Sequence, residues 1–386
     1  MEKEMTEVTV QQPLAGIKVV EFSTMITASL AAMMFAQQGA DVIKVEPPVI
    51  GDPMRWLGSQ KAGISGLFNN CNRAKRSITL DLKSEEGVAT ARKLCLDADI
   101  VIHNYRPGVM DRLGLGSKEL RTKKPELIYC AITGFGHEGP MAGRPAYDHV
   151  VQAMAGFMTL QGHPDDFAYV KTLICDKVTA YTAAQAITAA LFARERIGEG
   201  QHIDLSMLES CIAFLWPDGG MHVTLIGKDV AHGAPFADYY QYPVRTTDGA
   251  VAFAAMTDDH WDVVFDALKR PDLKSVEKYK GLANRSIHMG ELAQIVANEK
   301  PGLSTDEMVN LLAEQDVPAA PCIALKDLPD NEQILALAAF EDEDHSLLGQ
   351  VRNVGAPQRF GGQRLPPSGG SPALGQHTDE ILESIK

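Results

Sequence analysis

The chain has 386 residues, of which 45% are hydrophobic and 22% charged, a balance typical of a globular protein. This length exceeds that of an ordinary single core, so two domains are expected. The formal net charge of −14 argues against extended contact with nucleic acid or an anionic membrane, which both require a positive surface. A local basic pocket for a phosphorylated ligand remains compatible with this charge.

The cysteines and histidines show no spacing typical of a metal or redox site. No cysteine lies within three residues of another, which excludes a C-x-x-C motif, and no H-E-x-x-H motif occurs. No metal site is therefore predicted. Six cysteines in a chain of this length favour a reducing compartment, so we expect a cytoplasmic protein without a disulfide framework. No apolar stretch reaches the length of a membrane span.

The first half of the chain predicts strands that alternate with helices. Short apolar runs typical of strands occur at 16–22, 41–46, 76–82, 99–105 and 127–133. Helices are predicted between them at 27–38 and 85–96, the second capped by Ser84. Strands separated by helices indicate an α/β fold with a Rossmann-like, mostly parallel sheet and helices on both faces.

The second half predicts more helix and a change of domain. A helix is expected at 148–160, another after Asp176, a strand at 202–205 and a helix from Met207. Residues 217–241 are expected to be irregular and to lead into a smaller α+β domain. There Asp248 and Gly249 predict a hairpin turn. Further helices are predicted at 258–268, 289–298 and 304–315, and a last one near Thr378.

Two common enzyme classes lack their motifs in this sequence. The first strand-to-helix turn, residues 23–27, contains no glycine, although a bound dinucleotide needs a close backbone approach there. The glycines at 114 and 116 do not complete a phosphate-binding loop. No G-x-S-x-G elbow occurs either, which argues against a serine hydrolase.

Asp176 is the candidate catalytic residue. It follows the apolar run 170–175 and precedes a predicted helix at 177–194. Aspartate is a preferred N-cap, so a purely structural role is the simpler interpretation of its position. The positive end of a helix dipole also keeps a carboxylate ionised. An ionised carboxylate can act as a nucleophile and form a covalent acyl intermediate.

Several sequence blocks occur in one order along nearly the whole chain. Among them are PLAGIKVVEF at 13–22, GADVIKVEPP at 39–48, NRAKRSITLDLK at 72–83, NYRPGVMDRLGL at 104–115, ITGFGHEGPMAGRPAYD at 132–148, GEGQHIDLSML at 198–208 and LGQHTDEIL at 374–382. In these blocks the chain resembles the class III coenzyme A transferases. This family contains formyl-CoA:oxalate and carnitine CoA-transferases, and alpha-methylacyl-CoA racemase is related to them.

The resemblance implies a CoA-transferase of acyl-CoA metabolism that moves coenzyme A from an acyl-CoA donor to a small carboxylic acid. Asp176 is the implied nucleophile, which forms an aspartyl anhydride and then an aspartyl-CoA thioester. No metal or redox cofactor is implied. The implied contacts to coenzyme A come from Met25, Leu80, Lys83, Asn104, Tyr105, Arg106, Arg112 and Met207. The cationic members of this set can pair with phosphates, and the apolar members can hold adenine or the pantetheine arm.

Two alternatives to transfer remain. The racemase branch has a histidine where Tyr147 precedes Asp148, and a tyrosine with a pKa near ~10 is poorly suited to shuttling a proton at neutral pH. We therefore expect Tyr147 and Asp148 to line the substrate pocket, while the nearby His149 keeps racemisation open. A non-catalytic CoA-binding protein is the other alternative. Formyl-CoA transferases have a glutamine where Ile26 stands, so Ile26 in the pocket predicts a larger or less polar acid than oxalate.

The resemblance also implies an interlocked homodimer in which each chain threads through the other. The C-terminal segment then returns to the first domain. This gives a discontinuous large CoA-binding domain at 1–218 and 340–386, and a small domain with linkers at 219–339.

Overall fold

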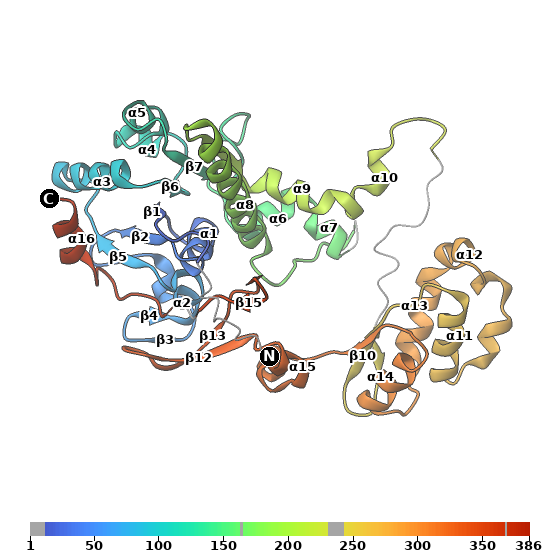
Figure 1. Cartoon of the computed structure of the whole chain (residues 1–386). Helices are drawn as coiled ribbons and strands as arrows, with labels where there is room; N and C mark the ends of the chain where they lie inside the picture. Colours follow the sequence, from blue (N-terminus) through green and yellow to red (C-terminus); the bar gives the residue numbers. More distant parts are fainter. Residues whose placement is uncertain (1–11, 163–164, 231–242, 367–368) are drawn as a thin grey trace, which may run out of the picture. The chain divides into compact units, whose positions relative to one another are not determined.

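The computed structural model describes residues 12–162, 165–230, 243–366 and 369–386 (Figure 1). The chain divides into two compact units. One unit comprises the chain up to Phe214 together with Leu335–Lys386, and the other is Leu215–Ile334. The first unit is therefore discontinuous, and the sequence-based boundaries at 218 and 340 lie a few residues further along the chain. No helix in the described ranges is long and apolar enough to cross a membrane.

The first unit is built on a six-stranded sheet in which every neighbouring pair is parallel, in the order β5-β2-β1-β6-β7-β8. In register, Val19 of the central strand β1 lies beside Val42 on one side and Ile100 on the other. The strands are β1 (Lys18–Phe22), β2 (Asp41–Glu46), β5 (Arg76–Thr79), β6 (Ile100–His103), β7 (Ile128–Thr133) and β8 (His202–Ser206). The predicted α/β fold with a parallel sheet is confirmed.

The strand order reverses between β1 and β6. In open parallel sheets a ligand crevice forms at such a reversal, outside the carboxyl ends of the strands, because the flanking connections leave in opposite directions. The loops that follow β1 and β6 are therefore expected to form a ligand site.

Helices cover both faces of this sheet (Figure 1). On one face α1 (Ile26–Gln37) packs against α8 (Ile174–Ile197), and alanines of both helices are buried at 28, 31, 32, 180 and 183. Such small side chains let the two helix backbones approach closely. On the other face lie α3 (Glu85–Asp97), α5 (Ser117–Lys123) and the C-terminal α16 (Thr378–Ser384). As predicted, Ser84 caps α3, and its hydroxyl accepts a hydrogen bond from the Gly87 amide.

The remaining elements of the first unit are short. They are β3 (Gln60–Lys61), β4 (Ile64–Ser65), α2 (Gly66–Asn72), α4 (Val109–Arg112), α6 (Asp148–Ala155), α7 (Phe157–Gln161), β12 (Phe340–His345), β13 (Gly349–Val354), β14 (Arg359–Phe360) and β15 (Gln363–Arg364). Two helices contain the boundaries between the units: α9 (Met207–Gly219) and α15 (Glu332–Ala336).

The second unit is α+β. Its antiparallel sheet has the order β11-β10-β9, and the Asp248–Gly249 hairpin predicted from the sequence joins β9 to β10. The core is built around Trp261 and Phe265. The elements are α10 (Met221–Thr224), β9 (Val244–Arg245), β10 (Ala250–Phe253), α11 (Asp258–Ala267), α12 (Leu282–Ile287), α13 (Met289–Asn298), α14 (Thr305–Ala313) and β11 (Ala319–Pro321).

Three predictions of local structure are corrected. The helix expected at 148–160 is two helices, because Gly156 adopts a φ of 97°, a left-handed conformation that ends α6. The helix α8 begins at Ile174, before the predicted start at 177, so Asp176 is its third residue and not its N-cap. Residues 217–230 are not simply irregular, since α9 continues to Gly219 and α10 follows. Residues 231–242 lie outside the described ranges.

A buried ion network lies beneath the loop that follows β1. Glu21 accepts hydrogen bonds from the ammonium groups of Lys44 and Lys75, each at 2.6 Å, and all three side chains are buried. Burial opposes ionisation of Glu21, but the two ammonium groups outweigh it and lower its pKa to about 2. Lys44 also pairs with Asp52, whose Oδ1 accepts the Met25 amide at 3.1 Å. Met25 has a φ of 63°, and a methionine in this left-handed region is strained, so the contact to Asp52 helps to hold the start of α1.

Candidate active site

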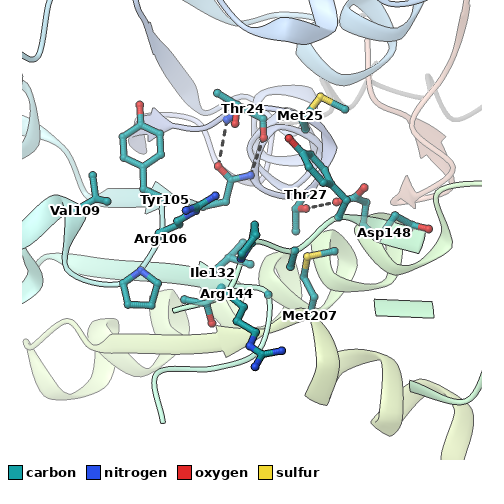
Figure 2. A pocket seen from close by; sticks show the side chains of 18 of the residues that line it. Thr24, Met25, Thr27, Tyr105, Arg106, Val109, Ile132, Arg144, Asp148 and Met207 are labelled. Carbon is teal, nitrogen blue, oxygen red and sulfur yellow. Dashed lines mark hydrogen bonds between the residues drawn. The ribbon is translucent and has the colours of Figure 1, made fainter. Parts of the chain in front are cut away.

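A cavity of about 580 Å³ lies at the carboxyl edge of the sheet, around the reversal between β1 and β6 (Figure 2). Each of the central strands contributes the residues that follow it. The lining comprises Thr24, Met25 and Thr27 after β1; Asn104, Tyr105, Arg106, Pro107 and Val109 after β6; Ile132, Thr133, Gly134, Ala142, Arg144, Pro145, Ala146, Tyr147, Asp148 and His149 from β7 onward; and Leu173, Asp176 and Met207. The cavity is where the strand order predicts a ligand site.

Asp176 is one of two buried carboxylates that line this cavity, with 8% of its surface exposed. The Thr27 hydroxyl donates a hydrogen bond to its Oδ1, and its backbone amide donates to Asp148 Oδ2 at 3.1 Å. Burial raises the pKa of Asp176 to about 6; the neighbouring Asp148 adds to this rise, while the Thr27 hydroxyl and Lys177 oppose it. Desolvation therefore makes Asp176 less acidic than an exposed aspartate. At neutral pH most molecules still carry the ionised form.

Asp148 holds the start of α8 in place. It is 2% exposed and lies at the first position of α6. Its Oδ1 accepts a hydrogen bond from Gln152 Nε2 at 2.6 Å. The Gln152 side chain also accepts the Val170 amide at 3.0 Å and donates to the carbonyls of Val170 and Thr172. Together the two side chains tie the segment before α8 to α6 and so fix where Asp176 emerges.

Asn104 joins the two strands at the reversal. Its Nδ2 donates to the Thr24 carbonyl at 2.7 Å, and its Oδ1 accepts the Thr24 amide at 3.1 Å (Figure 2). This reciprocal pair satisfies both backbone groups of Thr24 outside the sheet. It keeps the loop after β1 against the loop after β6, so that both face one cavity.

The structure brings most of the sequence-predicted site residues together. Those that line the cavity are Met25, Asn104, Tyr105, Arg106, Tyr147, Asp148, Asp176 and Met207. They come from five separate loops and helix ends. These residues are far apart in the sequence and become neighbours only in the folded sheet.

Four predicted residues lie elsewhere. Ile26 was expected in the substrate pocket, but it is 4% exposed and packs with Met54 and Phe68, because the first turn of α1 directs it toward α2. Leu80, expected to contact coenzyme A, is 7% exposed and belongs to the core on the α3 face. Lys83 and Arg112 are exposed and do not line the cavity.

Among the cavity residues that were not predicted are Arg144 and Thr27. Arg144 stands in the block at 132–148 but was not singled out there, although an arginine four residues before a buried aspartate was a usable signal. Thr27 is separated from Asp176 by 149 positions, and no local pattern indicates that the two side chains meet. Among the described residues no group of histidine, cysteine, aspartate and glutamate side chains is arranged to hold a metal ion.

A parallel sheet with a buried carboxylate in the cavity at its strand reversal, and no glycine turn for a dinucleotide, defines a ligand-binding α/β enzyme. The model of CoA-transferase family III matches residues 14–378. The chain is 32% identical to a succinate–glutarate CoA-transferase of Agrobacterium fabrum, with 97% of this chain and 96% of that protein covered. It is 30% identical to a succinyl-CoA:mesaconate CoA-transferase of Haloarcula hispanica, with 96% of each covered.

The solved structures agree with the sequence comparison. A CaiB/BaiF family protein from Brucella suis matches with a TM-score of 0.83 and 31% identity over 97% of this chain and 99% of that chain. A Mycobacterium tuberculosis protein matches with a TM-score of 0.80 and 28% identity over 96% and 99%. This chain belongs to CoA-transferase family III. It is a CoA-transferase that exchanges coenzyme A between an acyl thioester and a carboxylate.

The elevated pKa of Asp176 predicts that Asp176→Asn stabilises the fold. A carboxyl group whose folded pKa of about 6 exceeds the unfolded value of 3.8 costs stability wherever it must stay ionised in the folded state. We expect Asp176→Asn to raise the free energy of unfolding by about 1 to 3 kcal/mol at pH 7.5. The gain fades as the pH falls from about 6 to below 4, where wild-type Asp176 is neutral in both states. Urea denaturation at pH 7.5 and below pH 4 measures the free energy of unfolding of the variant and the wild type, and the exposed Asp229→Asn is the control.

Proposed function

We propose that this enzyme transfers coenzyme A from an acyl-CoA donor to a free carboxylic acid by covalent catalysis at Asp176. The single observation that carries the proposal is the buried Asp176 carboxylate in the cavity. One of its oxygens accepts the Thr27 hydroxyl, and in the described part of the chain no protein group donates to the other, Oδ2. That oxygen is therefore available to attack.

The chemistry needs only this carboxylate and the two substrates. Oδ2 attacks the thioester carbonyl and the carbon–sulfur bond breaks. Coenzyme A departs as a thiolate, and the acyl group and Asp176 are left as a mixed anhydride. The thiolate attacks the aspartyl carbonyl, which expels the donor acid and leaves an aspartyl-CoA thioester. The acceptor carboxylate then repeats the two steps in reverse. Covalent catalysis of this kind divides one difficult exchange into acyl transfers of similar energy.

The cavity has two ends that suit the two parts of the substrate. Tyr105, Arg106 and Val109 lie at one end, whereas Thr27 and Asp148 lie at the other, beside Asp176 (Figure 2). We propose that the pantetheine arm extends between these ends and that Met25 and Met207 pack against it. Arg106 is exposed at the far end and can pair with a phosphate. Lys83, Arg112 and Leu80 remain proposed contacts for the adenosine diphosphate part, outside the cavity.

We propose that the acceptor is a short dicarboxylic acid. The similar CoA-transferases named above act on succinate, glutarate and mesaconate, which are all dicarboxylates. Arg144 lines the cavity, and no ion pair involves it among the described residues. It can therefore pair with the second carboxylate of such an acid while the first reacts at Asp176. Ile26 is buried beside Met54 and Phe68 and is not among the residues that line the cavity, so Arg144 is the residue on which this proposal rests.

Asp176→Asn tests the covalent mechanism. Wild-type enzyme incubated with succinyl-CoA and no acceptor is expected to gain a coenzyme A adduct in intact-mass spectra, and hydroxylamine converts Asp176 to its hydroxamate. Asp176→Asn forms no adduct, and its transfer rate falls by at least about 1,000-fold, because the nucleophile is absent. The exposed Asp229→Asn is the matched control and keeps the wild-type rate.

The same samples separate transfer from the alternatives. A racemase would exchange the alpha hydrogen of the acyl group with deuterated water and form no adduct; His149 in the cavity is the residue that motivates this measurement. A CoA-binding protein without catalysis would show neither reaction. Full transfer activity in Asp176→Asn would overturn the mechanism.

Arg144→Gln tests the dicarboxylate assignment. A charge-assisted hydrogen bond contributes about 1.5 to 3 kcal/mol, so we expect the KM for succinate as acceptor to rise by roughly 10- to 100-fold. The KM for butyrate, which has the same chain length and one carboxylate, is expected to stay within about 3-fold. Arg144→Lys is expected to recover part of the affinity for succinate. An equal loss for both acids would exclude Arg144 as a group that recognises the second carboxylate.

We also propose that the enzyme is an interlocked homodimer. Large apolar side chains are exposed on four helices of the first unit, and exposed apolar side chains that gather into one surface are typical of an interaction site. They include Val150 and Met154 on α6, Leu160 on α7, Tyr181 and Phe192 on α8, and Ile212 and Phe214 on α9. The discontinuity of the first unit is compatible with a ring through which a second copy passes.

Light scattering tests the assembly. We expect a mass of about twice the chain's 41.9 kDa. Because threaded rings cannot separate without unfolding, a tagged and an untagged preparation are expected not to exchange subunits when mixed under native conditions. They are expected to exchange after unfolding and refolding together. A monomer would exclude the dimer, and rapid native exchange would exclude the interlock.

A further inference from the structure

The side chain of Thr27 is hydrogen-bonded to the proposed nucleophile, Asp176. It lies in the first turn of α1, is 3% exposed, and donates its hydrogen bond to Asp176 Oδ1. The contact joins α1 to α8 across the buried alanines of both helices. We propose that this hydroxyl determines which oxygen of Asp176 attacks, and that it then stabilises the oxyanion formed on the aspartyl carbonyl. The inference rests on the proposed covalent function.

The position of Thr27 in its helix leaves its hydroxyl available. A threonine in a helix interior usually donates to the carbonyl four residues earlier. Thr179 and Thr182 of α8 do this, to the carbonyls of Cys175 at 2.7 Å and Val178 at 2.9 Å. Four residues before Thr27 lies Ser23, which precedes the helix. The Thr27 hydroxyl therefore turns to a partner outside its own helix, and that partner is Asp176.

The hydrogen bond distinguishes the two oxygens of the nucleophile. Oδ1 shares its electron density with the Thr27 hydroxyl, so Oδ2 is the better nucleophile and forms the bond to the acyl carbon. As the carbon–sulfur bond of the donor breaks, Oδ1 becomes the carbonyl oxygen of the anhydride. Thr27 then faces the oxygen on which charge develops in the next step.

Two of the four acyl transfers occur at the aspartyl carbonyl. When the thiolate attacks Cγ, the electron pair of the carbonyl moves to Oδ1, and its return breaks the bond from Cγ to Oδ2 and releases the donor acid. When the acceptor carboxylate attacks the thioester, the charge again moves to Oδ1 and then expels the thiolate. A donor fixed on Oδ1 stabilises both tetrahedral intermediates, and contributes less to the two steps at the substrate carbonyls.

The surroundings of Asp176 make a neutral donor important. Two charged groups shift the pKa of Asp176. Asp148 from α6 opposes its negative charge, and the partly exposed Lys177 on α8 favours the charge more weakly than the Thr27 hydroxyl does. Both neighbouring thiols stay protonated because their pKa values are raised, that of Cys71 on α2 by burial and that of Cys175 on α8 by its hydrogen bond with Cys211 and by burial. Tyr147, His149, Arg106 and Arg144 line the rest of the cavity.

The test measures how fast the aspartyl-CoA adduct forms from succinyl-CoA without an acceptor, by quenched-flow mass spectrometry. We expect Thr27→Val, which keeps the shape and removes the hydroxyl, to slow adduct formation by about 100-fold, as for loss of one oxyanion donor. Thr27→Ser is expected to stay within about 5-fold of the wild type. Thr182→Val, which removes a helical hydroxyl that donates to a backbone carbonyl, is the matched control and keeps the wild-type rate.

The pH profile separates a chemical role from a structural one. A donor to the carboxylate favours its ionised form and lowers its pKa, so removing the hydroxyl raises the pKa of Asp176 above about 6. The acid limb of kcat/KM for succinyl-CoA is therefore expected to move to higher pH in Thr27→Val and to return in Thr27→Ser. A variant that is only misfolded loses activity without moving this limb.

Each outcome has one meaning. If Thr27→Val forms the adduct at the wild-type rate and its acid limb is unmoved, the role of Thr27 is excluded while covalent catalysis at Asp176 stands. If Asp176→Asn retains transfer, the proposed function itself fails. Circular dichroism and binding of free coenzyme A are expected to be unchanged in Thr27→Val. Slow adduct formation in both Thr27→Val and Thr27→Ser would also overturn the proposal, because the hydroxyl would not be the feature that matters.

Discussion

The structure of the site depends on keeping one carboxylate charged inside the protein. Asp176 is largely buried, and its amide is held by a second buried carboxylate, Asp148. Both features disfavour the ionised form that a nucleophile requires. The pKa that results, about 6, leaves the group ionised at neutral pH and more basic than an exposed aspartate. A more basic carboxylate is the stronger nucleophile, so burial favours the proposed attack by Asp176 as long as the carboxylate stays ionised.

The parallel sheet positions the groups that surround Asp176. The loops after β1, β6, β7 and β8 all leave at one edge, and the reversal between β1 and β6 separates two of them enough to hold a ligand. Asn104 closes the gap between those loops by pairing with the backbone of Thr24. Below them the ion network of Glu21, Lys44 and Asp52 fixes the strained start of α1. These contacts position Thr27, in the first turn of α1, for its hydrogen bond to Asp176.

Sequence reasoning found the architecture from local signals, and the resemblance found eight of the residues that line the cavity. Apolar runs of strand length, separated by helical segments, indicate the parallel sheet directly. The resemblance of whole blocks then pointed to Asp176 and to residues after several strands, such as Asn104 and Met207. It expected Ile26 in the pocket, whereas this side chain packs in the core beside Phe68, since one position along a helix turns a side chain by about 100°. It also misjudged where α8 begins, because helix ends have weak signals.

What the sequence determined by itself was the kind of fold and the family of chemistry. Periodicity indicates strands and helices, and a series of matching blocks points to Asp176 as the proposed nucleophile. What only the tertiary structure decided was the electrostatics of that nucleophile. The contact of Thr27 with Asp176 spans 149 positions, and the pKa of Asp176 follows from its burial and from Asp148. The physical reason is that desolvation and hydrogen bonding depend on distances in space, which a linear pattern of residue types does not encode.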